Sequence, residues 1–145
     1  MKRTLLVAAG LAMAAFSLQA IAGEDKGVFM SSADVEFQDI IPGTVAFATV
    51  VGDRESGAHG TFVRIPPGQA TPMHTHGSAY HAVVIDGNFE NPIEGDEASN
   101  VTLTKGSYYY VPAEAAHITR CAEDSPVDCL TFFYQDVPFD FAVSE

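Results

Sequence analysis

Three histidines carry the chemistry that this sequence offers. His74 and His76 form a His-x-His pair, and His117 follows about forty residues later. Residues two apart on a β-strand point to the same side of a sheet, so both imidazoles of the pair can reach one metal ion. A His-x-His pair alone is a weak signal, because a chain with five histidines can contain one by chance. The residues around the histidines therefore decide the interpretation.

Glycines and a proline stand at regular intervals around these histidines. Gly68 precedes His74 by six positions, and Gly87 follows the pair. Further along, Gly106 precedes Pro112 by six positions, and His117 follows Pro112 by five. This spacing resembles the two conserved motifs of the cupin family.

The second motif departs from that family at two places. Glu114 stands where the motif has its second glycine, and Cys121 stands where it ends in asparagine. The likeness extends over nearly the whole chain after residue 22. Over this range the sequence is similar to a bacterial cupin subfamily related to anti-sigma-factor cupin domains and acetylacetone dioxygenase. Further residues carry it: Gly52-Asp53, Gly60-Thr61-Phe62, Pro66-Pro67-Gly68, Tyr80 to Ile85, Gly106-Ser107-Tyr108 and Phe139-Asp140-Phe141.

The resemblance implies an all-β cupin fold, a double-stranded β-helix or jelly-roll barrel, in which His74, His76 and His117 bind one divalent metal ion. The ion would be Fe, Zn, Mn or Cu, because imidazole suits several of these metals and does not select among them. An exported location favours Zn, Cu or Mn, whereas the resemblance to the dioxygenase favours iron. The fold itself hosts many activities and selects none.

No glutamate occupies the place where typical cupins carry a carboxylate ligand. Counting forward from His76 gives His81, whereas counting back from Gly87 gives Tyr80. Adjacent strand residues face opposite ways, so only one of the two can point inwards. By analogy with the dioxygenase spacing we expect His81 to face the metal as a possible fourth ligand. Whichever residue faces inwards, Tyr80 or His81, is a candidate catalytic group that orients a ligand or manages a proton.

Two functions are consistent with these residues. The first is a metal-dependent enzyme, dioxygenase-like, that acts on a small organic molecule chelated at the three-histidine site. The second is a noncatalytic protein that binds or senses a metal or small ligand. An open coordination position would favour the enzyme, because structural metal sites are closed.

The rest of the chain reads as strands and turns. Segments rich in β-branched and aromatic residues recur at short intervals between turn-forming clusters, as in all-β sandwiches and barrels. Asp86-Gly87 is a typical hairpin signal, because glycine readily adopts positive φ. The expected strands are Thr44 to Val51, Thr61 to Ile65, Met73 to His76, Tyr80 to Ile85, Val101 to Thr104, Ser107 to Val111, His117 to Cys121 and Leu130 to Gln135.

The start of the chain is typical of a cleavable signal peptide. Lys2 and Arg3 form a basic start, residues 5–18 are nearly all apolar, and Ala20-Ile21-Ala22 offers the small residues that a signal peptidase reads. The apolar stretch is shorter than the roughly 20 residues that span a bilayer, which argues against a retained anchor. We therefore expect a periplasmic or secreted protein.

Composition limits the possible partners. A signal peptide of residues 1–22 leaves 23–145 as a single cupin domain with five basic and nineteen acidic side chains, a formal charge of −14. Such a surface repels nucleic acid and anionic lipid, so we expect neither nucleic acid nor, after cleavage, a membrane as partner. A small-molecule ligand or substrate is expected instead, and cupin relatives suggest a homodimer.

The remaining residues have structural roles in this interpretation. Cys121 and Cys129 flank a loop dense in turn formers, and in an exported protein they are expected to form a disulfide. His59 lies beside a glycine-rich turn and is expected at the surface. In the run 108–110 the two outer tyrosines are expected to face the interior and the middle one the solvent. Arg120 is expected to face outwards.

Overall fold

The structure, a computed structural model, describes residues 27–144, so the expected signal peptide lies outside the described residues. Their secondary structure is ten β-strands and two short 3-10 helices, Ser32–Asp34 and Glu97–Ser99, with no α-helix among them. None of the helices in the described part of the chain has the length and apolarity to cross a membrane. The expected all-β class is confirmed for these residues.

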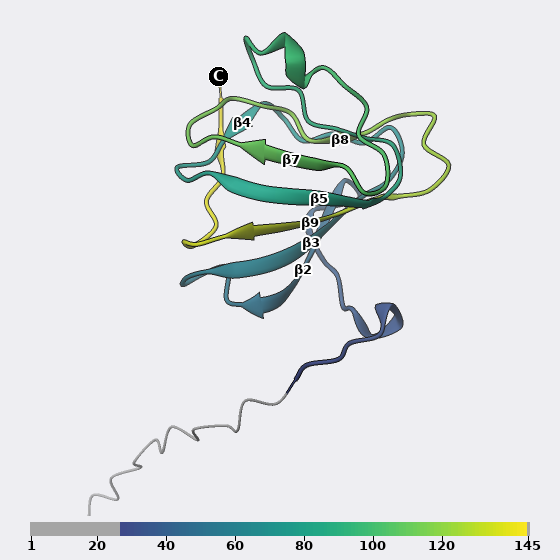
Figure 1. The fold of residues 1–145 in the computed structure, drawn as a ribbon, viewed down its shortest axis with the longest axis vertical. Helices are drawn as coiled ribbons and strands as arrows, with labels where there is room; N and C mark the ends of the chain where they lie inside the picture. Colours follow the sequence, from purple (N-terminus) through teal and green to yellow (C-terminus); the bar gives the residue numbers. More distant parts are fainter. Residues whose placement is uncertain (1–26, 145) are drawn as a thin grey trace, which may run out of the picture.

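Six strands form one antiparallel sheet, which is the large wall of the barrel (Figure 1). Their order across the sheet is β1-β2-β3-β9-β5-β7. β9, the last strand but one along the chain, therefore lies between β3 and β5. The six strands are β1 (Gln38–Ile41), β2 (Val45–Gly52), β3 (His59–Ile65), β9 (Cys129–Gln135), β5 (Tyr80–Asp86) and β7 (Tyr108–Val111).

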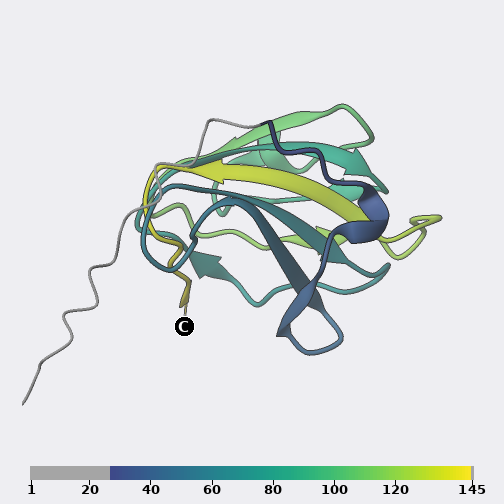
Figure 2. The same ribbon diagram turned by 90° about the horizontal axis from the view of Figure 1, so that it is seen from below.

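Four short strands form the opposite wall. β4 (His74–Thr75) pairs with β10 (Ala142–Val143), and β6 (Phe89–Glu90) pairs with β8 (Arg120–Cys121). An isolated bridge between His74 of β4 and His117 joins two segments of this wall. Figure 2 shows the curved large sheet along one side and the short strands with their loops along the other.

The core lies between the two walls and is built by alternate residues of each strand. On β5, Tyr80, Ala82 and Val84 are buried, whereas His81 and Val83 are exposed. Phe47 of β2 and Phe133 of β9 meet edge to face across the interior, with ring centroids 5.9 Å apart. The histidine site lies inside this layer of apolar and aromatic side chains.

Several strand boundaries differ from the expected ones. The expected strand 101–104 is not formed, because only Leu103 bridges to Phe89, and the strand expected over 117–121 is reduced to β8. β1, β6 and β10 were not anticipated. All of these segments belong to the short, irregular wall or to a sheet edge, where long-range pairing rather than local sequence sets the strand.

The hairpin expected at Asp86-Gly87 is also wrong, although Gly87 does adopt positive φ, at 83°. After β5 the chain crosses to the short wall, and Phe89 pairs with Cys121 instead of returning along β5. A Cβ on Gly87 would lie 2.8 Å from the Cα of Cys129. The glycine is therefore needed both for its backbone conformation and for the close approach of the chain to the start of β9.

Two side-chain orientations are opposite to those expected. Tyr109 faces inwards, and Tyr108 and Tyr110 are exposed, because Tyr109 lies opposite the buried Ala82 in the pairing of β7 with β5. His59 is fully buried rather than at the surface. β3 begins two residues earlier than expected, and this puts His59 on the same inward face as Thr61. Arg120 is exposed and forms an ion pair with Glu90, as its expected outward placement allows.

The expected disulfide joins Cys121 of β8 to Cys129 of β9, with both residues almost fully buried. It therefore links the short wall to the large sheet. The two cysteines are eight positions apart in the sequence, so the disulfide closes a short loop, and their Cα atoms are 5.5 Å apart.

Replacing both cysteines, Cys121→Ala with Cys129→Ala, should lower the free energy of unfolding by about 2–3 kcal/mol, because a short closed loop is released in the unfolded chain. Urea unfolding followed by circular dichroism would measure the loss. Added reductant should destabilise the native protein by a similar amount and leave the variant unchanged. Equal stability of the oxidised native protein and the variant would contradict this role.

Candidate metal centre

His74, His76 and His117 meet inside the barrel, and one nitrogen from each lies within 4.8 Å of the others. All three side chains are buried. His74 lies on β4, His76 follows it by two residues, and His117 lies on the neighbouring segment of the short wall. In the part of the chain that the structure describes, no other group of histidine, cysteine and carboxylate side chains has a geometry suited to a metal ion.

Backbone hydrogen bonds place His74 and His117 opposite each other. The N–H of His74 donates to the carbonyl of His117 at 3.0 Å, and the N–H of His117 donates back at 2.9 Å. His117 is thus held directly opposite His74, and the imidazole rings are 4.2 Å apart. The alternation of the strand then turns His76 to the same side.

Each imidazole is also oriented by a backbone carbonyl. The Nδ1–H of His74 donates to Pro72 at 2.9 Å, that of His117 donates to Ala115 at 2.8 Å, and that of His76 donates to Asp140. With Nδ1 protonated, Nε2 carries the free lone pair in all three rings. This is the tautomer and orientation that metal-binding histidines have in proteins, so the residues fit a metal ion.

Burial keeps these imidazoles neutral. Desolvation, with a smaller contribution from the neighbouring His117, lowers the pKa of His74 to about 4. Desolvation likewise lowers the pKa of His117 to about 4 and that of His76 below its usual value. The neutral ring is the form that binds metal.

A small apolar pocket of about 50 Å³, partly open to solvent, adjoins the histidines. His74, His76 and Tyr80 form part of its wall. The remaining lining is mostly aliphatic and aromatic, with three threonines: Ile40, Ile41, Val45, Phe47, Val63, Thr71, Tyr109, Thr119, Thr131, Phe133, Phe139 and Phe141. A mostly apolar pocket beside a few converging polar atoms is typical of a small-molecule site.

The segment 139–143, which we call the C-terminal strap, covers the histidines. Phe141 stacks on His74 with ring centroids 4.3 Å apart, and Phe139 lies 5.2 Å from His76. The carboxylate of Asp140 accepts from the backbone N–H of Gly77 at 2.6 Å. No role was expected for the strap from the sequence, although Phe139-Asp140-Phe141 is part of the cupin resemblance.

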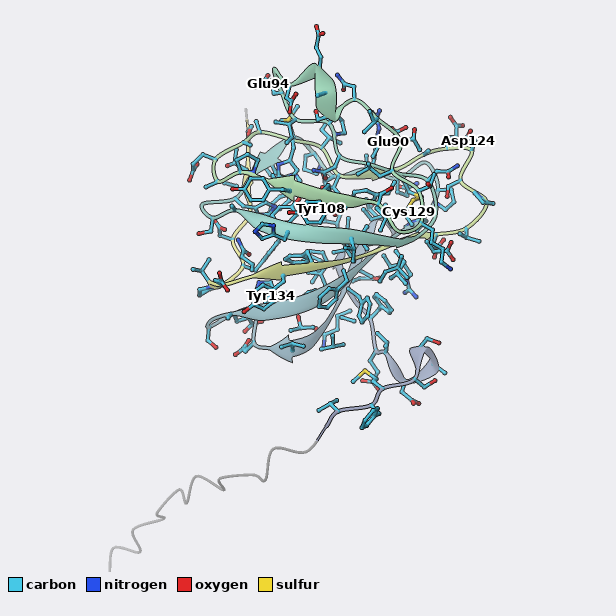
Figure 3. The ribbon with its side chains drawn as sticks, viewed as in Figure 1. Glu90, Glu94, Tyr108, Asp124, Cys129 and Tyr134 are labelled. Atoms are coloured by element: carbon cyan, nitrogen blue, oxygen red, sulfur yellow. A yellow bond between two sulfur atoms is a disulfide. The ribbon has the colours of Figure 1, made fainter. Side chains whose placement is uncertain are left out.

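The structure reverses the expected order of Tyr80 and His81. Tyr80 is buried, and its hydroxyl lies 3.2 Å from Nε2 of His117. His81 is exposed on the outer face of the large sheet, where its Nδ1 lies 2.7 Å from the hydroxyl of Tyr108. Figure 3 labels Tyr108 on this sheet. The pairing of Ala82 with the inward-facing Phe133 fixes this orientation, so the expectation that His81 is a fourth ligand is wrong.

Glu114, in the turn before His117, has φ of 61°. It is the single residue other than glycine with positive φ among residues 27–144. This is the position at which the cupin motif has a glycine, so the turn keeps its conformation despite the substitution. Its backbone N–H donates to the carbonyl of His76 at 2.8 Å, which ties the turn to the metal centre.

A two-walled antiparallel barrel with a buried histidine triad defines the protein as a cupin. Residues 25–137 match the family described as the ChrR cupin-like domain, and the chain belongs to that family. No curated protein matches the chain.

Solved structures share this fold at low sequence identity. An RmlC-like cupin from Shewanella frigidimarina is 19% identical, with a TM-score of 0.59 over 78% of this chain and 92% of that chain. DMSP lyase DddQ from Ruegeria pomeroyi is 18% identical, with a TM-score of 0.60 over 77% of this chain and 62% of that chain. The Rhodobacter sphaeroides complex of SigE with the anti-sigma ChrR contains a chain that is 24% identical, with a TM-score of 0.56 over 73% of this chain and 51% of that chain.

The buried histidines should make the metal-free protein less stable in acid. The pKa of His74 and of His117 is about 4 in the folded protein, against about 6.5 in an unfolded chain. Between these values the unfolded chain binds more protons, so the free energy of unfolding should fall by a few kcal/mol (~2–4) as pH drops from 6.5 to 4. Urea unfolding at several pH values measures this.

The variant His81→Ala serves as a control in the same experiment, because the side chain that it removes is exposed and lies outside the triad. It should show the same acid-dependent loss as the native protein. A flat stability profile between pH 7 and pH 4.5 would contradict the buried, neutral state of the triad.

Proposed function

We propose that this protein is an exported metal-dependent enzyme, dioxygenase-like, which acts on a small organic molecule that chelates the ion through oxygen atoms. The single observation that carries the proposal is the convergence of three Nε2 lone pairs beside an apolar pocket. Three protein ligands leave positions open for a substrate, as in catalytic rather than structural metal sites.

His74, His76 and His117 would hold the ion in this function. When bound, the ion supplies Lewis-acid chemistry or a route for electron transfer to dioxygen. The phenyl rings of the C-terminal strap exclude water from the imidazoles, and the apolar lining accommodates the carbon skeleton of the substrate. The hydroxyl of Tyr80 lies at the inner end, beside the ligand nitrogen of His117.

Three further observations support the proposal. Structural neighbours include a DMSP lyase, an enzyme whose named substrate is a small molecule. The disulfide between Cys121 and Cys129 is typical of an oxidising compartment, which supports a periplasmic or secreted location. The strongly acidic composition supports a small molecule rather than nucleic acid as the partner.

The alternative function is a noncatalytic module that senses a metal or small ligand. The C-terminal strap favours it, because Phe141 stacks directly on His74 and limits access to the ion. Membership of the ChrR cupin-like domain family also favours it, since a chain of the SigE complex with the anti-sigma ChrR shares the fold. Turnover of a chelating substrate separates the two functions.

Replacing a ligand should abolish metal binding. Purified His76→Ala and His117→Ala should lose stoichiometric metal in elemental analysis, whereas His81→Ala should keep it, because His81 lies outside the barrel. An ion bound only by the folded state at 100 times its Kd adds about 2.7 kcal/mol of stability, so the two variants should also melt at lower temperature. Full metal content in either variant would exclude the assigned ligands.

Enzyme activity is tested with the iron-loaded protein and small diketones or catechols under air. Saturable oxygen consumption should occur with the native protein and be lost in His117→Ala. If a diketone binds tightly to the loaded protein and no oxygen is consumed, the dioxygenase proposal fails and the sensing function is favoured. Native mass spectrometry of the loaded protein measures that binding independently of turnover.

A further inference from the structure

We propose that Tyr80 is a fourth ligand of the ion, bound through its phenol oxygen beside the three histidines, in a five- or six-coordinate centre that would keep a position for the substrate. This inference rests on the proposed metal site. Its basis is the position of the hydroxyl, the fate of its hydrogen bond when an ion binds, and the charge of the site.

The hydroxyl of Tyr80 already lies where a ligand would be. Its oxygen is 3.2 Å from Nε2 of His117. Two atoms that each bind one ion at about 2.0–2.2 Å are roughly 3–3.5 Å apart in tetrahedral or octahedral geometry. The phenol ring also lies edge-on to His76, with ring centroids 5.4 Å apart, so Tyr80 approaches two members of the triad at once.

An ion would displace the hydrogen bond that Tyr80 now makes. Nδ1 of His117 donates to Ala115, so Nε2 is the acceptor and the phenol is the donor. Once the lone pair of Nε2 binds an ion, the buried hydroxyl loses this acceptor, and the side chains of Asn91 and Thr119 are the polar groups that remain beside it. Coordination replaces the lost hydrogen bond, and the phenol proton leaves to solvent as metal binding releases protons from its ligands.

The charge of the site also favours an anionic oxygen. The group of side chains that could hold the ion contains three imidazoles and no carboxylate. The carboxylate of Asp140 is engaged with the backbone N–H of Gly77 at the strap. A divalent ion bound only by neutral rings beside an apolar pocket would be a poorly compensated buried charge. A phenolate reduces that charge by one.

Copper provides a direct test. The native protein, stripped with a chelator and loaded with one equivalent of Cu(II), should show a phenolate-to-copper charge-transfer band in the visible spectrum. Tyr80→Phe should lose the band and bind zinc more weakly by more than the roughly 10–100-fold that loss of an outer hydrogen bond costs. The control is Tyr109→Phe, because Tyr109 also faces the interior, with its ring 6.2 Å from that of Tyr80, and should keep the band and the affinity.

The outcomes separate this inference from the proposed function. Stoichiometric copper without the band in the native protein would overturn the tyrosine ligand and leave the three-histidine site intact. Retention of the band in Tyr80→Phe would overturn it as well. Failure of the native protein to bind either copper or zinc would remove the metal site and this inference together, whereas a failure to consume oxygen would leave both standing.

Discussion

The orientation of three imidazole rings by backbone carbonyls is the constraint on which the rest of this molecule depends. Each Nδ1–H is occupied by a carbonyl, so each Nε2 must point into the barrel. Two of those carbonyls come from the loops just before His74 and His117, and the third comes from Asp140 near the C-terminus. The geometry of the centre is therefore set by main-chain positions far apart in sequence, and any change in how the walls close would misdirect a ligand.

Closure of the two walls relies on a few close contacts rather than on continuous pairing. The short wall contains only two-residue strands and isolated bridges, and separate backbone hydrogen bonds join its irregular segments. The disulfide ties it to the large sheet, and Gly87 permits the approach of the chain to Cys129. Residues of this weakly paired wall supply all three histidines. The cross-link thus stabilises the part of the fold that contains the chemistry.

The C-terminal strap both completes and restricts the centre. It supplies the carbonyl that orients His76, and its Phe141 covers His74. Besides the two-residue pairing of β10 with β4, the N–H of Phe139 donates to Arg54 and the carboxylate of Asp140 accepts from Gly77, so movement of the strap would break several hydrogen bonds. The same movement would release the ring of His76. Access to the site and the precision of its ligands are consequently coupled.

The histidine triad and the barrel type followed from the resemblance of the motif spacing to cupins, and the disulfide followed from two cysteines around a turn-rich loop in a chain expected to be exported. Two histidines at a separation of two share a face in any strand, and the glycine and proline intervals around them describe turns that depend on nearby residues alone. The orientation of β5 could not be predicted this way. Ala82 and Val84 share one face with Tyr80, and Val83 and Ile85 share the other with His81, so both faces are apolar. Only the pairing of β5 with β9, which puts Ala82 opposite Phe133, decided that Tyr80 enters the site. His59 and the strap were missed for the same reason, because burial in a sheet is set by neighbours that are distant in the chain.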